Sequence, residues 1–70
     1  MESITKHITH EQYLALKDLT PVERYHYADN LDNKIINICI KDGYGFYGCG
    51  EPYEKGGEYF VTLTIGNTCD

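Results

Sequence analysis

The sequence is poor in several residue types that build common catalytic and membrane-bound sites. It has no tryptophan, and its single serine, Ser3, lies near the start of the chain. A serine-based triad would therefore depend on a nucleophile in a segment that we expect to be frayed. No stretch approaches the roughly 20 apolar residues of a membrane span, and the opening MESITKHITHEQ lacks the apolar run of a secretion signal. These absences predict a cytoplasmic protein without a serine nucleophile.

Positive charge is also scarce. Six Lys and Arg stand against eleven Asp and Glu, which gives a formal net charge of -5. Affinity for nucleic acid or anionic lipid grows with the number of phosphates neutralised, so this balance opposes both ligands and suits a partner with a basic surface. An acidic surface that only keeps the protein in solution is equally compatible with the count.

The cysteines and histidines predict neither a metal nor a cofactor. Cys39, Cys49 and Cys69 are odd in number and widely spaced, as expected for reduced thiols. The three histidines belong to no CxxC or HExxH pattern. Seventy residues leave little room for an enclosed pocket, so we expect a protein that is not an enzyme.

Two helix starts are encoded in the first half of the chain. Thr9 and Thr20 each precede a Gln or Glu by three residues, which is the spacing of a capping box, and Pro21 suits a first helical position. These signals predict helices over about 9–18 and 20–30, with Val22, Tyr25 and Ala28 of the second helix facing the core.

From Ile35 onward the apolar residues repeat with a period of two, which indicates β-strands over about 35–40, 44–50 and 58–65. Asp42-Gly43 and Gly56-Gly57 are the hairpin turns expected between them. The registers that the two turns impose disagree by one residue, which predicts a bulge within 48–52.

Together these elements predict a single small α+β domain over residues 1–70. Two short N-terminal helices pack on one face of a three-stranded antiparallel β-meander, in the order ααβββ.

The glycine-rich segment DGYGFYGCG, residues 42–50, spells GxGxxG, but a strand follows it where a dinucleotide site needs a helix. Gly43-Tyr44-Gly45-Phe46 resembles the middle of the RNP1 motif of RRM and cold-shock domains, where aromatic rings on an open sheet stack on bases. Asp42 stands where that motif has Lys or Arg. This resemblance implies an alternative function, a single-stranded nucleic-acid-binding module that uses Tyr44 and Phe46.

The expected contact surface combines open-face aromatics with the acids of the second hairpin. With the helices on the face that carries Ile36, Ile38 and Ile40, the rings of Tyr44, Phe46 and Phe60 lie on the open face, and exposed rings favour protein interfaces. The partner-binding residues predicted in this way are Tyr44, Phe46, Phe60, Tyr53, Glu51, Glu54 and Glu58.

In size and charge the chain resembles phage-encoded anti-restriction and anti-CRISPR inhibitors. That likeness implies a stoichiometric inhibitor that blocks a nucleic-acid-binding complex, with a larger protein as its partner. A small homodimeric structural protein, pairing exposed sheet edges, is a further alternative.

Overall fold

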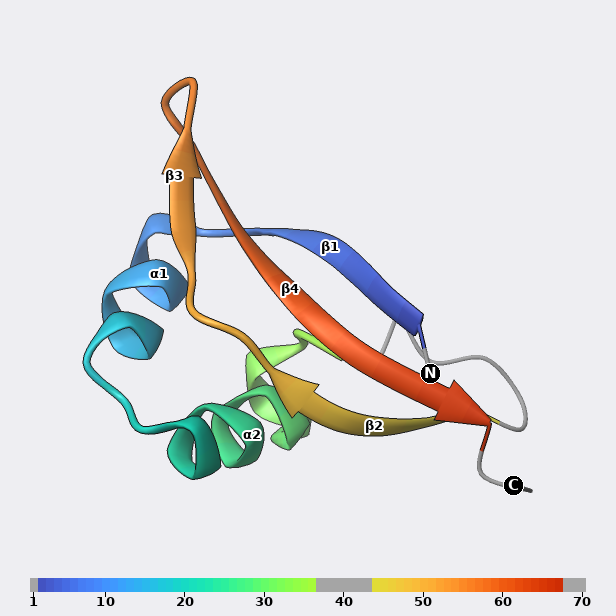
Figure 1. Ribbon diagram of the computed structural model, residues 1–70. Helices are drawn as coiled ribbons and strands as arrows, with labels where there is room; N and C mark the ends of the chain where they lie inside the picture. Colours follow the sequence, from blue (N-terminus) through green and yellow to red (C-terminus); the bar gives the residue numbers. More distant parts are fainter. Residues whose placement is uncertain (1, 37–43, 68–70) are drawn as a thin grey trace.

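The computed structural model describes residues 2–36 and 44–67. In chain order its elements are β1 (Glu2–Ile8), α1 (His10–Lys17), α2 (Pro21–Asp29), the short 3-10 helix η1 (Leu31–Asn33), β2 (Tyr44–Cys49), β3 (Tyr53–Lys55) and β4 (Glu58–Asn67) (Figure 1). The α+β class is confirmed, with a four-stranded antiparallel sheet rather than a three-stranded one. Among the described residues, no helix is long and apolar enough to cross a membrane.

The strand β4 lies at the centre of the sheet. β1 pairs with it along one side, while β2 and β3 share the other side, and every pairing is antiparallel. The expectation of a frayed N-terminus is therefore wrong, because Ser3 pairs with Thr64 and His7 with Phe60. The chain order places one strand before the helices.

The predicted strand over 35–40 and its Asp42-Gly43 turn lie mostly outside the described residues. Ile35 and Ile36 are described, and both are buried in a bend that follows η1. Both join the hydrophobic core, and because they lie in a bend, the predicted strand does not begin at Ile35.

The second hairpin is confirmed. Gly56 and Gly57 form its turn, with φ of 62° and 82°, and Lys55 pairs with Glu58. Positive φ at both central residues is the requirement of a type I′ turn, which glycine meets without steric cost.

The predicted bulge is also present. Cys49 pairs with Leu63 and Tyr53 with Phe60, so β2 and its continuation contain one residue more than β4 over this interval. A second irregularity, at Tyr47, was not expected: the register shifts between Phe46 and Gly48.

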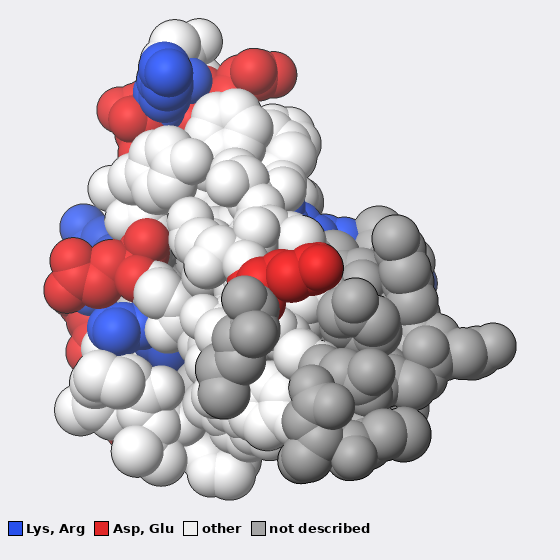
Figure 2. Space-filling view, turned by 45° about the vertical axis from the view of Figure 1, so that its right-hand side comes forward, with Lys and Arg blue, Asp and Glu red and all other residues white. Residues whose placement is uncertain are grey.

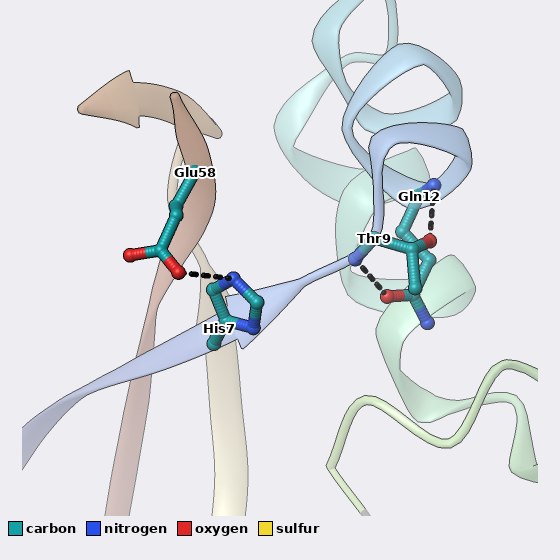
Figure 3. Close-up of polar contacts among 4 residues, drawn as sticks. All are labelled: His7, Thr9, Gln12 and Glu58. Carbon is teal, nitrogen blue, oxygen red and sulfur yellow. Dashed lines mark hydrogen bonds and ion pairs between the residues drawn. The ribbon is translucent and has the colours of Figure 1, made fainter. Parts of the chain in front are cut away.

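Both predicted capping boxes are formed. The Gln12 backbone N–H donates to Thr9 Oγ1 at 3.1 Å, and the Thr9 N–H donates to Gln12 Oε1 at 2.9 Å (Figure 3). Thr20 and Glu23 repeat this arrangement at the start of α2. The hydrogen bonds from Thr20 lower the pKa of the Glu23 carboxyl.

Both helices pack on one face of the sheet, and the hydrophobic core lies between the helices and the sheet (Figure 1). The residues buried there are Ile8, Leu16, Ala28, Ile35, Ile36, Cys49, Val61 and Leu63.

One prediction about which residues of α2 face the core is wrong. Val22 was expected in the core but is 66% exposed, whereas Arg24 is buried. Arg24 donates from Nε to the Cys49 carbonyl at 3.1 Å and from Nη1 to the Leu19 carbonyl at 2.9 Å. A long aliphatic stem lets this residue cover apolar surface while its head satisfies backbone oxygens, which helical periodicity does not reveal.

Candidate functional site

Most of the predicted contact residues belong to the β3–β4 hairpin, which comprises β3, the Gly56-Gly57 turn and the start of β4. All three residues of β3 are exposed. The hairpin projects beyond the rest of the sheet (Figure 1). Its charged side chains gather at the tip above a belt of uncharged residues (Figure 2). The hairpin therefore presents a charged rim next to an uncharged surface.

Three rings from three adjacent strands lie side by side on the face away from the helices. Phe60 pairs across the sheet with His7 on one side and with Tyr53 on the other, and residues directly opposite in a ladder share a face. The His7 and Phe60 rings meet edge to face with centroids 5.3 Å apart. The Tyr53 and Phe60 rings stack at 5.7 Å with an interplanar angle of 29°. We call these three residues the ring row.

The opposite face of the same hairpin packs against α1. Tyr59 stacks on His10 with centroids 4.9 Å apart and contacts Tyr13 at 4.8 Å. Tyr59 and Phe60 are consecutive, so the base of the hairpin is held by rings on both faces of the sheet. These ring contacts restrict the side-chain freedom of the hairpin base.

The carboxylates of the hairpin divide between the two faces. Glu58 lies two residues from Phe60, on the side of the ring row, and its Oε1 is 3.8 Å from His7 Nε2 (Figure 3). Glu54 pairs with Tyr59 and therefore belongs to the helix side. Glu51 is exposed just before β3. With Lys55 as the one cation of the segment 51–60, the hairpin is acidic.

The free edge of β3 offers little for strand addition. In a hairpin with a two-residue turn, Lys55 and Tyr53 direct their backbone groups toward β4, which leaves those of Glu54 facing outward. The next outward position is Pro52, which has no N–H to donate. The outer edge of the hairpin therefore presents mainly side chains rather than backbone groups that another strand could pair with.

One predicted contact residue lies on the wrong face. Phe46 was expected beside Phe60 on the open face, but it pairs with Ile65 and stacks on Tyr25 of α2. The register shift at Tyr47 is the reason, because an extra residue inverts the alternation and turns Phe46 and Cys49 to the same face. Of Tyr44, which begins β2, the structure describes only the backbone.

A cavity of about 410 Å³ opens between α2 and β2, away from the hairpin. Its lining residues are Pro21, Val22, Tyr25, His26, Tyr47, Gly48 and Cys49. Burial raises the pKa of the Cys49 thiol to about 11, although the charge of Arg24 acts in the opposite direction. A thiol with this pKa is protonated at neutral pH and is a poor nucleophile.

Sequence reasoning missed His7 as part of the candidate site, because it placed the residue before the first helix and outside any strand. The available signal was the short polar-apolar alternation of Ser3, Ile4 and Thr5, with Ile8 on the same face as Ile4. No group of three or more potential metal ligands occurs within the described parts of the chain.

Comparison with protein-family models, with curated proteins and with solved structures finds no match to this chain.

Proposed function

We propose that the chain is a non-enzymatic protein-binding domain that docks its β3–β4 hairpin on a basic surface of a larger protein. The observation that carries this proposal is the ring row, held in place at the hairpin base and bordered by the Glu58 carboxylate. Protein interfaces commonly place aromatic anchors at the centre and polar groups at the rim.

The acidic balance of the chain extends the proposal to the kind of partner. A surface that carries more carboxylates than cations is drawn to proteins that bind nucleic acid, because those proteins display basic grooves. The domain then acts as a stoichiometric inhibitor in the cytoplasm by occupying such a groove, as the likeness in size and charge to phage-encoded inhibitors implies.

The nucleic-acid alternative has less support. Its platform needs the faces of Tyr44 and Phe46, and one face of the Phe46 ring is covered by Tyr25 at an interplanar angle of 10°. The carboxylates of the hairpin would also repel a phosphate backbone.

A capture experiment with charge-matched variants tests the proposal. The tagged protein is used to capture partners from host lysate at low and high salt, and the retained proteins are identified by mass spectrometry. One variant replaces Glu51, Glu54 and Glu58 by Gln. The control variant removes the same charge on the helix side, as Asp18→Asn, Asp29→Asn and Asp32→Asn, all three of which are exposed.

We expect a partner that is retained at low salt, is lost at high salt and is lost by the hairpin variant alone. Equal retention by both variants would show that the hairpin is not the contact surface. A partner lost equally by both would show that net charge, rather than this site, causes the binding.

A further inference from the structure

The ring row ends beside a carboxylate, and this combination has the shape and charge to hold a flat cation. We infer that the surface formed by Tyr53, Phe60, His7 and Glu58 seats an arginine side chain of the partner protein. The guanidinium lies over the exposed Tyr53 ring, on the side that Phe60 does not cover, and donates hydrogen bonds to Glu58. This inference rests on the proposed function and names the chemistry by which the hairpin recognises its partner.

The rings supply the first half of the site. Tyr53 and Phe60 stack at 29° with centroids 5.7 Å apart, and Tyr53 remains 40% exposed. The face of an aromatic ring carries negative potential, so a cation within about 6 Å of the ring centroid is attracted to it. The His7 ring meets Phe60 edge to face at 62° and borders the surface on the β1 side.

The Glu58 carboxylate supplies the second half. Its side chain is 64% exposed, and its contact with His7 Nε2, at 3.8 Å, is longer than a hydrogen bond. Lys55 lies across the ladder from Glu58, yet no ion pair joins them in the described structure. The carboxylate oxygens can therefore accept a pair of parallel hydrogen bonds from a guanidinium.

Arginine fits this arrangement better than lysine or a nucleic-acid base does. A guanidinium is flat and weakly hydrated, so it can stack on an aromatic ring while it donates two parallel hydrogen bonds to a carboxylate. An ammonium is a compact and strongly hydrated charge. A base could stack on the same rings, but its phosphates would meet the carboxylates of Glu51, Glu54 and Glu58.

The test uses two blocked tripeptides, acetyl-Gly-Arg-Gly-amide and acetyl-Gly-Lys-Gly-amide, titrated into the ¹⁵N-labelled full chain. We expect saturable shifts of the amide resonances of His7, Tyr53, Glu58 and Phe60, with the arginine peptide bound about threefold more tightly than the lysine peptide. The Tyr53→Leu variant, which keeps the bulk but loses the aromatic face, is expected to bind about threefold more weakly.

Glu58→Gln and Glu54→Gln form a matched pair. Each removes one charge from the same hairpin, but Glu58 is on the face of the ring row and Glu54 is on the other. We expect Glu58→Gln to weaken the arginine peptide at least about fivefold and Glu54→Gln to leave its affinity within about twofold of wild type.

Equal losses in the two variants, or equal affinity for the two peptides, would overturn the arginine site. A fluorescent oligothymidylate that shifts the same resonances at lower concentration than the arginine peptide would also overturn it, in favour of nucleic acid.

If the hairpin carboxylates are needed for partner capture but the arginine peptide does not bind, the arginine assignment fails and the proposed function stands. If the peptide binds as expected but hairpin variants capture partners normally, the proposed function fails instead.

Discussion

Tyr25 and Phe46 stack nearly face to face, with ring centroids 4.7 Å apart and an interplanar angle of 10°. Tyr25 comes from α2 and Phe46 from β2, so the pair joins a helix to the sheet. The Tyr25 hydroxyl also donates to the Phe46 carbonyl at 3.4 Å. Phe46 is half-buried against the core, and this position gives it a structural role.

Phe46→Ala is therefore expected to lower the free energy of unfolding by about 2 kcal/mol, since the truncation removes a ring that packs on Tyr25 and the core. Urea unfolding followed by circular dichroism measures the change. At a temperature where the variant is still folded, it should bind the arginine peptide with wild-type affinity. Lost peptide binding with unchanged stability would contradict the structural role.

The turn of the β3–β4 hairpin should respond to substitution according to backbone conformation. Gly56 has φ of 62°, a left-handed value that Asn tolerates and β-branched residues do not. We expect Gly56→Asn to be nearly neutral and Gly56→Val to cost about 1–2 kcal/mol. Thermal unfolding of the two variants in parallel measures the difference, and similar melting temperatures would mean that the turn carries no strain.

Arg24 is a buried charge that links α2 to β2 through the Cys49 carbonyl and to the α1–α2 connection through the Leu19 carbonyl. Arg24→Met keeps much of the aliphatic stem but leaves both carbonyls without this donor. We expect a loss of about 2 kcal/mol in unfolding free energy. Lys17→Met, at an exposed position, is the control for the loss of a positive charge. A comparable decrease in its unfolding free energy would mean that net charge, rather than the buried hydrogen bonds, causes the effect.

The protonation of Cys49 should make stability depend on pH in the alkaline range. The thiol pKa is raised from its ordinary 9.0 to about 11 in the folded protein, so the unfolded chain releases this proton at lower pH. The resulting stabilisation is fully present below pH 9.0 and is lost as pH rises toward about 11.

Urea unfolding at pH 8 and pH 10.5, compared with the same measurement on Cys49→Ala, isolates this contribution, and we expect the wild type to lose more stability over the interval. Iodoacetamide should also modify Cys49 far more slowly in the native protein than in urea, as mass spectrometry of the Cys49 peptide can measure. Equal alkylation rates in both states would show that the thiol is accessible.

Local signals in the sequence predicted the local structure well. Thr9 and Thr20 were identified as helix caps because the capping box needs only residues three positions apart. The Gly56-Gly57 turn was likewise predicted from two adjacent residues whose conformational freedom suits a tight hairpin.

Features that depend on tertiary contacts were predicted less well. β1 was missed because Lys6 occupies a core-facing register position opposite Val61, which interrupts the apolar alternation of Ile4 and Ile8. Phe46 was assigned to the wrong face because the shift at Tyr47 arises from pairing with β4 and leaves no marker at that residue.

The candidate site shows the same division. Tyr53, Phe60 and the hairpin acids were predicted from the strand pattern and the hairpin. The structure shows Tyr53 and the acids exposed and Phe60 partly buried, and their role in binding stays a prediction. His7 lies some fifty residues from Phe60 in sequence, so the contact between them could not be predicted from local sequence patterns.

The central position of β4 also constrains how the chain folds during synthesis. Every other described strand pairs with β4, and β4 is the last of them to leave the ribosome. Until residues 58–67 have emerged, β1, β2 and β3 lack the strand with which each of them pairs in the described sheet. The β1–β4 pairing then closes a loop of more than fifty residues, so we expect sheet formation to follow translation of β4 and to be slower than formation of the two capped helices.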